Sequence, residues 1–343
     1  MMLNQTVEVA PRREPSIMDV AREAGVSAQT VSRVATGKNV VRPQTREKVV
    51  EAMHRLGYRP NGAARALKSG RYRNIGVIMF SLSSYGNMRT LEAIAGEAAR
   101  VGYALTLIPL GAASQSRVSG AFARLSEQAV DGIVILIEAH QLNESDIELP
   151  QGLPVVVVDS NAQYDQPVVD TDQAQGARLA TEHLLDMGHR TVWHVAGPDE
   201  SFSAQRRRES WKATLHSRGA AAPEALVGDW SANSGRAAGR ELALREEVTA
   251  VFAANDQMAL GVMHAIHEAG LRIPEDISVV GFDDTPESAS FWPALTTIRQ
   301  HFDQVGVAAL QALVAAIEDQ PRERGDLVPT ELIVRRSTAA PSR

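Results

Sequence analysis

Apolar residues recur at helical spacing in the first regular pattern of the chain, at Ile17, Val20, Ala21 and Ala24. Gly25 suits the end of that helix, and Ser27 suits the start of the next one. The second helix would bury Val31 and Val34. The pattern therefore predicts two short helices joined by a tight turn, a helix-turn-helix.

A third helix is predicted over residues 45–56, where Gly57 ends the periodic pattern. It would complete a small all-α core. A further segment, residues 61–70, is capped by Asn61 and closed by Gly70. It is too short to hold a helix alone, because stable peptide helices need about 12–15 residues. We expect it to become helical only when it is bound to a partner.

The exposed face of the second predicted helix carries side chains that suit DNA. Gln29 can bond adenine through two hydrogen bonds, Arg33 can bond guanine in the same way, and Ala28 can touch a thymine methyl group. Thr30 and Ser32 suit phosphate oxygens. The alternative is an ordinary helix pair whose Gln and Arg are only solvated.

From residue 74 onward, short apolar runs alternate with helix-length segments. Strands are predicted at 75–80, 104–110, 133–137, 155–158, 191–196, 250–253 and 277–282. Helices are predicted at 88–102, 176–188, 204–219, 234–244 and 257–270. Continuous Val- and Ile-rich strands between helices are typical of parallel sheets covered on both faces. The pattern predicts two doubly wound α/β lobes in series.

Polar and aromatic residues follow several of these strands, and such sheets bind ligands at the carboxyl ends of their strands. The residues are Asp159, Arg207, Trp230, Asn255, Asp256, Asp283 and Asp284. Carboxylate, amide and guanidinium groups can pair with vicinal hydroxyls, while an indole covers an apolar sugar face. Any one of them could instead be a helix cap or a loop bond, so the prediction of a polyhydroxylated ligand depends on their joint placement.

The distribution of charge also separates the helical head from the α/β part of the chain. Residues 11–73 carry 14 Lys and Arg against 5 Asp and Glu, a net charge of +9, and residues 74–343 carry −14. A basic head suits phosphate contact. The chain has no Cys, and no metal-ligand spacing, phosphate loop or nucleophile motif is present, so we expect no cofactor, no metal and no catalytic residue. No membrane span or signal peptide is recognised, and a cytoplasmic protein is expected.

The head closely resembles the lactose-repressor (LacI/GalR) family. The motifs are Asp19-Val-Ala, Ala24-Gly-Val-Ser, Thr30-Val-Ser-Arg-Val, Thr45-Arg-Glu-Lys-Val, Gly57-Tyr and Arg59-Pro-Asn. The resemblance implies base contacts from Ala28, Gln29 and Arg33, and phosphate contacts from Ser16, Ser27, Thr30, Ser32, Thr45 and Asn61. It also implies that Leu67, with Ala64, enters the minor groove of a palindromic operator. The alternative for Leu67 is a buried leucine in a docking helix.

The rest of the chain is similar to the lactose-repressor branch of that family, up to about residue 335. The similar stretches include Val195-Ala-Gly-Pro, Gly228-Asp-Trp-Ser-Ala, Ala254-Asn-Asp-Gln-Met-Ala-Leu-Gly and Asp283-Asp-Thr. The resemblance implies effector contacts from Asp159, Arg207, Asn255, Asp283 and Gln300, with Trp230 and Phe302 as apolar walls.

Several positions depart from that branch. Residues 81–89, beginning with Ser81, are more polar than the apolar surface expected there, and Ser81 is a candidate effector contact. Thr171 stands in place of an aromatic residue, and Leu136 in place of an asparagine. Ala28 replaces a tyrosine of the recognition helix, so a different operator is expected. We predict a galactoside-like or related oligosaccharide effector.

The expected fold is α/β: an all-α helix-turn-helix head and hinge helix, then a two-lobed periplasmic-binding-protein-like core of doubly wound parallel sheets. The expected divisions are 1–14 lead-in, 15–60 head, 61–72 hinge, 73–158 plus about 301–329 first lobe, and 159–300 plus about 330–343 second lobe. Crossings between lobes are expected near Asp159, residues 298–302 and Glu331. Residues after Ile333 lack leucine heptads, which favours a symmetric homodimer without a coiled-coil tail.

The expected function is a dimeric repressor of sugar-utilisation genes, whose operator binding is controlled by a saccharide between the lobes. Three alternatives remain. A periplasmic sugar-binding protein would not need residues 16–70. A glycosidase could use Asp159 and Asp283 as paired carboxylates. A regulator of the same family could take a nucleobase as co-repressor.

Overall fold

The computed structural model describes residues 15–35, 41–59, 70–79, 82, 84–111, 115–136, 152–158, 168–320 and 326–342. The chain divides into two compact units between Tyr72 and Arg73. The predicted contacts Asn61, Ala64, Leu67, Ser81 and Asp159 lie outside the described residues.

The head consists of three helices, α1 (Ile17–Ala24), α2 (Ala28–Ala35) and α3 (Pro43–Leu56). Ser16 caps α1 in a reciprocal arrangement: its Oγ accepts from the Asp19 N–H at 3.3 Å, and its own N–H donates to Asp19 Oδ2 at 2.8 Å. Helix α3 begins two residues before the predicted start. Pro43 is favourable in the first turn, where no intrahelical N–H bond is needed.

The core of the head is small and apolar. Its buried members come from all three helices, as the spacing predicted: Val20, Ala21, Val31, Val34, Val49 and Ala52. Gln29 and Arg33 of α2 remain exposed, one helical turn apart. The head thus presents these two side chains together on one exposed helical face.

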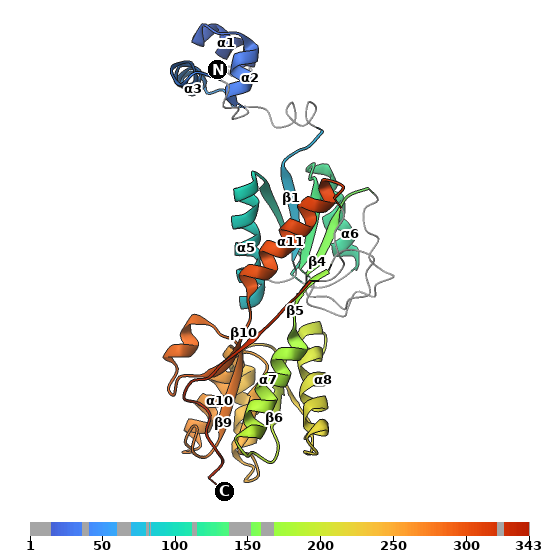
Figure 1. Ribbon diagram of the computed structural model, residues 1–343, viewed down its shortest axis with the longest axis vertical. Coiled ribbons are helices and arrows are strands. Elements are labelled where there is room, and N and C mark those ends of the chain that lie inside the picture. Colours follow the sequence, from blue (N-terminus) through green and yellow to red (C-terminus); the bar gives the residue numbers. More distant parts are fainter. Residues whose placement is uncertain are drawn as a thin grey trace, which may run out of the picture. The chain divides into compact units, whose positions relative to one another are not determined.

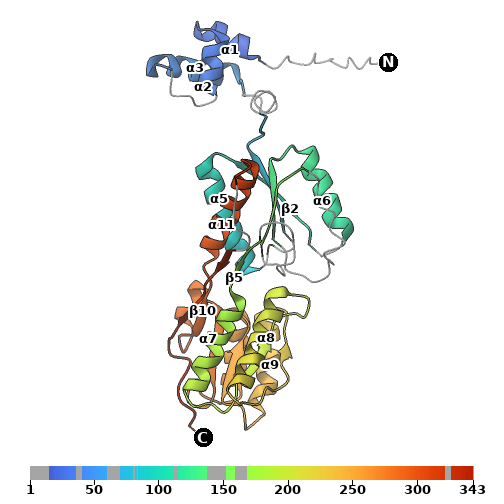
Figure 2. The ribbon, with the colours of Figure 1, turned by 45° about the vertical axis from the view of Figure 1, so that its right-hand side comes forward.

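The first sheet of the core has the strand order β11-β5-β4-β3-β1-β2, and every pairing in it is parallel. Its strands are β1 (Asn74–Met79), β2 (Ala104–Pro109), β3 (Gly132–Leu136), β4 (Val155–Val158), β5 (Val168–Thr171) and β11 (Asp326–Val328). Helices α5 (Tyr85–Val101) and α11 (Phe302–Ile317) lie side by side on one face, and α6 (Gln115–Glu127) covers the other (Figures 1 and 2).

The second sheet has the strand order β12-β10-β9-β8-β6-β7, and only β12 runs antiparallel to its neighbour. Its strands are β6 (Trp193–Ala196), β7 (Leu226–Val227), β8 (Ala250–Ala253), β9 (Ser278–Asp283), β10 (Thr296–Arg299) and β12 (Glu331–Ile333). Helices α7 (Gln173–Asp186) and α8 (Phe202–Ser217) pack on one face, and α9 (Ala232–Ala243) and α10 (Asp256–Glu268) on the other.

Both sheets are buried on two faces because alternate side chains of each strand enter different clusters. In β1, Ile75 and Val77 pack with α5 and α11, whereas Ile78 packs with α6. In β8, Val251 packs with α9 and α10, whereas Phe252 packs with α7 and α8. The predicted doubly wound α/β fold is confirmed.

The chain crosses between the lobes at three places. Strand β5 pairs with β4 and β11 in the first sheet, so the first crossing lies between Thr171 and Gln173. The prediction of a crossing near Asp159, with a lobe boundary at residue 158, therefore needs correction. Strand β5 has the sequence Val-Val-Asp-Thr, so its apolar run of two residues was too short to be recognised as a strand. The other two crossings lie between Arg299 and Phe302 and between Val328 and Glu331.

Within the described residues, no helix combines the length and the apolar character that crossing a bilayer requires.

Close packing of α9 against α10 depends on the absence of a side chain at Gly261. A Cβ atom there would lie 2.0 Å from the backbone oxygen of Ala232 and 2.5 Å from the backbone nitrogen of Arg236. Backbone atoms cannot rotate away as a side chain does, so any larger residue forces the two helices apart.

We predict that Gly261→Ala lowers the free energy of unfolding of the core by at least about 1–3 kcal/mol through overpacking. Urea unfolding followed by tryptophan fluorescence measures this. Gly96→Ala is the matched control: it lies exposed within α5, and its Cβ would have no atom within 4 Å. In that variant the free energy of unfolding should rise by about 0.5–1 kcal/mol. Equal effects of the two substitutions would contradict the packing account.

Candidate effector site and DNA-binding surface

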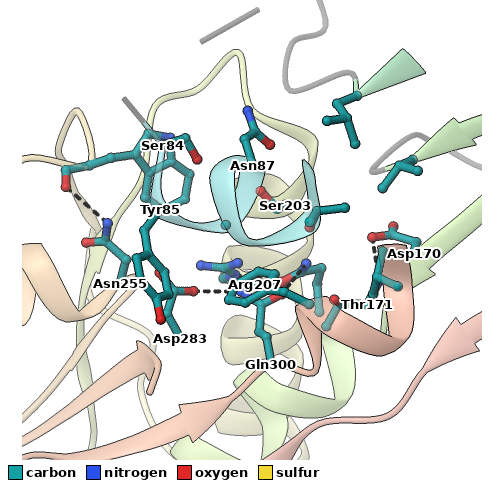
Figure 3. A pocket seen from close by; sticks show the side chains of 18 of the residues that line it. Ser84, Tyr85, Asn87, Asp170, Thr171, Ser203, Arg207, Asn255, Asp283 and Gln300 are labelled. Carbon is teal, nitrogen blue, oxygen red and sulfur yellow. Dashed lines mark hydrogen bonds between the residues drawn. The ribbon is translucent and has the colours of Figure 1, made fainter. Parts of the chain in front are cut away.

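A cavity of about 500 Å³ opens between the two lobes of the core. Its lining comes from the strand ends of both sheets and from the first turns of helices that pack on them (Figure 3). Arg207, Asn255 and Asp283 belong to the second lobe, and Phe302 begins α11, which packs on the first sheet. The cavity lies within the range of about 300–1,000 Å³ that small-molecule pockets span.

A chain of hydrogen bonds crosses the floor of this cavity. Arg207 Nε donates to Gln173 Oε1 at 2.8 Å, Gln173 Nε2 donates to Gln300 Oε1 at 3.1 Å, and Gln300 Nε2 donates to Asp283 Oδ1 at 2.6 Å. All four side chains are buried. Because each amide must donate and accept in a fixed direction, the chain fixes the orientation of all four groups.

The Arg207 guanidinium is held on several sides. Its Nη1 donates to the carbonyl oxygen of Ala254, and its Cζ lies 3.8 Å from the centre of the Phe282 ring and 5.5 Å from that of Trp230. Cation–π contact of this kind stabilises a charge removed from water. Arg207 is therefore a pre-positioned donor group at the cavity wall.

Trp230 is positioned by backbone conformation and by one amide. Its φ of 70° lies in the left-handed region, which costs free energy for a residue with a side chain. Asn255 Nδ2 donates to the Trp230 carbonyl at 3.0 Å, while Asn255 Oδ1 caps α10 by accepting from Met258 N at 2.8 Å. Gly197 leaves room for the indole, since a Cβ there would lie 2.3 Å from it.

Asp283 ends β9 with φ of 114°, again a strained conformation. Burial raises the pKa of this carboxyl group to about 7, although the nearby Arg207 charge opposes the shift. The neighbouring Asp256 adds to the rise. Asp256 itself does not line the cavity: it accepts from Thr285 N at 2.8 Å, Ser288 Oγ at 2.6 Å and Thr297 Oγ1 at 2.6 Å, so it ties the loops behind the site together.

The described effector candidates all line this one cavity: Arg207, Trp230, Asn255, Asp283, Gln300 and Phe302. Leu136 and Thr171, the two positions noted above as differing from the lactose-repressor branch, line it as well. Asp284 does not, because its carboxylate accepts from Arg299 Nε at 2.7 Å and from Arg335 Nη2 at 2.5 Å.

Several lining residues were not recognised from the sequence as contacts, among them Tyr85, Asn87, Asp170 and Gln173. Asp170 follows a buried Val-Val pair, and this signal could have marked it as a strand end. Tyr85 and Asn87 lie within residues 81–89, which the sequence marks as an unusually polar stretch without indicating which of its side chains face a ligand. In the structure the Tyr85 ring meets that of Phe302 edge-on, at 5.8 Å between centres.

The candidate DNA-binding surface is on the head. Gln29 and Arg33 are exposed, and Ala28 is half-buried beside them. Ser27 Oγ accepts from Thr30 N at 3.2 Å, so it caps α2. Ser16, Ser32 and Thr45 are also half-buried near helix starts or on α2. The described part of the chain contains no cluster of three or more His, Cys, Asp or Glu that could hold a metal ion.

Comparison with known proteins identifies the family of the chain. Residues 16–61 match the family of bacterial regulatory proteins, lacI family, and residues 181–338 match a periplasmic binding protein-like domain. The lactose operon repressor of Escherichia coli (strain K12) is 36% identical over 331 residues, 95% of this chain and 91% of the relative. The chain belongs to the LacI family of bacterial transcriptional regulators.

Other members of the LacI family are similar over comparable lengths. The HTH-type transcriptional repressor PurR of Vibrio atlanticus (strain LGP32) is 32% identical over 330 residues, 94% of this chain and 98% of the relative. A solved structure of the lac repressor dimer, bound to operator and the anti-inducer ONPF, has a TM-score of 0.86 and 35% identity over 96% of this chain and 100% of that one. The predicted family is thus confirmed, as is a regulator rather than an enzyme.

The raised pKa of Asp283 gives this LacI-family protein a testable pH dependence. The folded pKa of about 7 exceeds the ordinary value of about 4, so the folded state binds the proton more tightly. The resulting stabilisation is complete below pH about 4 and is lost as the pH rises through about 7. Asp283→Asn removes the titration and keeps an oxygen that accepts from Gln300.

We predict that, between pH 5 and 8, wild type loses unfolding free energy relative to Asp283→Asn by up to about 1.4 kcal/mol per pH unit. Urea unfolding at four pH values measures the difference. Asp186→Asn, at an exposed carboxylate paired with Arg218, is the control. A difference that stays constant with pH for Asp283→Asn would contradict the burial account.

Proposed function

We propose that the protein is a dimeric repressor of sugar-utilisation genes, whose binding to a palindromic operator is released by a galactoside-like or related saccharide. The observation that carries the effector class is the meeting of Arg207, Asn255, Asp283 and Gln300 around one cavity that Trp230 and Phe302 also line. Polar groups beside aromatic faces suit a ligand with hydroxylated edges and an apolar ring face. The protein would act in the cytoplasm, where operator DNA is.

The operator contacts follow from the exposed face of α2. Gln29 and Arg33 would bond base edges in the major groove, with Ala28 against a thymine methyl group. Ser16, Ser27, Thr30, Ser32 and Thr45 would bond phosphates and set the register. Asn61, Ala64 and Leu67 would complete the contacts at the centre of the operator.

Control by a saccharide requires that it prefer one relative orientation of the lobes. Gln173 and Gln300 each lie beside a crossing between the lobes, and both belong to the hydrogen-bond chain in the cavity. A ligand that bonds Arg207 and Asp283 would therefore act on both ends of that chain. In a symmetric dimer, reorientation of the first lobes would separate the two hinge segments and weaken operator binding.

A nucleobase co-repressor is the second candidate. The rings of Tyr85, Trp230 and Phe302 all line the cavity, and a flat base could stack on one of them. Asp283 and Gln300 could then bond its edge. A nucleobase would raise operator affinity, so the sign of the ligand effect separates the two candidates.

We predict that at least one saccharide weakens operator binding. Labelled duplexes selected from a random palindromic library serve in fluorescence anisotropy, with a panel of mono- and disaccharides and, separately, purine bases. Arg207→Lys keeps the charge but not the planar fork that reaches both Gln173 and Ala254. In this variant, the saccharide concentration needed to weaken operator binding should rise at least about tenfold. The operator affinity without saccharide should stay as in wild type.

Arg208→Lys is the matched control, since Arg208 lies on the same helix and pairs with an exposed carboxylate of Asp199. It should respond to the saccharide as wild type does. A panel in which no saccharide changes operator affinity would contradict the proposed effector, and a purine that tightens binding would favour the second candidate.

We predict that Gln29→Ala weakens operator binding by about 1–3 kcal/mol and relaxes the base preference at one position in each half-site. Selection from the random library, followed by anisotropy, measures both effects. Gln128→Ala, at an exposed position at the end of α6, is the control and should bind as wild type does. An unchanged base preference in Gln29→Ala would exclude Gln29 as a base contact.

A further inference from the structure

Helix α8 packs into both lobes of the core. Trp211 and Leu215, in its second half, are buried in the second lobe together with residues of α7 and the second sheet. Phe202, its first residue, is 6% exposed and belongs instead to an apolar cluster whose other buried members all come from the first lobe. The start of α8 is therefore an apolar contact between the lobes.

The Phe202 ring is presented by a capped helix start. Ser201 Oγ accepts from the Ala204 N–H at 3.3 Å, which fixes the first turn of α8. The cluster that Phe202 joins lies on the α6 face of the first sheet and includes side chains of β1, β3 and β4. The ring thus contacts the interior of the first lobe from a helix of the second.

Arg206, one helical turn later, makes a polar contact with the first lobe. Its Nη1 donates to Oδ2 of Asp170, in strand β5 of the first sheet. The side chain of Asp170 is 3% exposed and that of Arg206 is 24% exposed. Asp170 Oδ1 also accepts from the Thr171 N–H at 2.7 Å, so the carboxylate is held in one orientation. Residues four apart share a helical face, and this face of α8 meets the first lobe.

The contacts of Phe202 and Arg206 are separate from the ligand cavity. Neither residue lines it, whereas Arg207, the next residue along α8, does. Helix α8 therefore presents one side to the cavity and another side directly to the first lobe. The direct contact is made by the protein alone and needs no ligand.

Both contacts favour one orientation of the lobes. Units joined by short connections move relative to each other unless an extensive apolar interface holds them. Separating the lobes at α8 would expose the Phe202 ring to water and would take the Arg206 guanidinium away from the buried Asp170 carboxylate. Removing one partner of a buried ion pair costs much more than breaking an exposed pair.

We propose that Phe202 and Arg206 form an interlobe clasp that holds the core in one lobe orientation in the absence of ligand. This inference does not depend on the chemistry of the effector. A ligand that prefers another orientation must have enough differential affinity to overcome the clasp. The clasp therefore sets how strongly the lobes respond to any ligand.

The distance between the lobes, measured by electron paramagnetic resonance, tests the clasp. Because the chain has no Cys, Gln128→Cys in the first lobe and Ala213→Cys in the second place one spin label on each lobe, both at exposed positions. The labelled full chain is mixed with an excess of unlabelled chain, so that distances within one chain are measured. With the clasp intact, one dominant distance is expected, because a minor orientation is about 0.1–10% populated.

Phe202→Ala combined with Arg206→Gln removes both contacts. It should change the ratio of the two orientations at least about a hundredfold, which brings a second distance to about a tenth of the population or more. Phe202→Leu combined with Arg206→Gln keeps an apolar side chain in the cluster. It retains the fold if the first combination does not, and it should show the same second distance.

Phe122→Ala combined with Arg208→Gln is the matched control. Phe122 is 5% exposed in the same cluster but belongs to α6 of the first lobe, and Arg208 pairs with the exposed Asp199. This variant loses the same kinds of side chain and should keep the single distance. Circular dichroism verifies that each variant is folded. Folded clasp variants with an unchanged distance, or a control with the same second distance, would overturn the clasp. Either result would leave the proposed function standing, because that function depends on the cavity.

Discussion

The chain of hydrogen bonds from Arg207 through Gln173 and Gln300 to Asp283 is the constraint on which the candidate effector site depends. It joins four separate segments of the chain, and two of its members, Gln173 and Gln300, lie beside crossings between the lobes. Buried amides and charges are costly unless each finds its partner, so breaking one link exposes the others to that cost. The positions of the ligand-facing groups and of the lobes are therefore coupled by the same bonds.

The third crossing is tied to the first by a similar arrangement. Gln175 Oε1 accepts from the backbone N–H of Thr330 at 2.6 Å and from its hydroxyl at 2.9 Å, and the Asp172 N–H donates to the Val328 carbonyl at 2.8 Å. Three connections linked in this way cannot move independently. A change at one crossing must either move the others or break a buried hydrogen bond, and this favours a few discrete lobe orientations over a continuum.

The strained backbone at the site also indicates that surrounding contacts hold this region in a fixed conformation. Trp230 and Asp283 both have positive φ, and each is held by groups that also face the cavity. Such strain persists only where surrounding contacts enforce it, and it occurs often at ligand sites. Here the enforcing contacts are the hydrogen bond from Asn255 Nδ2 to the Trp230 carbonyl and the hydrogen bond from Gln300 Nε2 to Asp283. The shape of the pocket is thus largely set before a ligand enters.

Much of this architecture could be predicted from the sequence. The apolar periods gave the two sheets and the head, and the rule that ligands meet strand ends identified Arg207, Asn255 and Asp283, because these depend on local pattern and general topology. The role of Gln173 could not be predicted, because nothing local distinguishes a glutamine in the first turn of a helix from a solvated one. Its partners, Arg207 and Gln300, are 34 and 127 residues away. Asp170 was missed because its strand offers an apolar run of only two residues, Val168 and Val169, before the polar Asp170 and Thr171.

The central claim is that these bonds couple the effector site to operator binding. It is tested most directly by measuring saccharide affinity with and without saturating operator DNA, in wild type and in Gln173→Met. Linkage requires that operator change saccharide affinity by the factor by which saccharide changes operator affinity, about 5–150-fold for coupled sites. The account predicts such a factor in wild type and a value near one in Gln173→Met. Equal factors in the two proteins would contradict it.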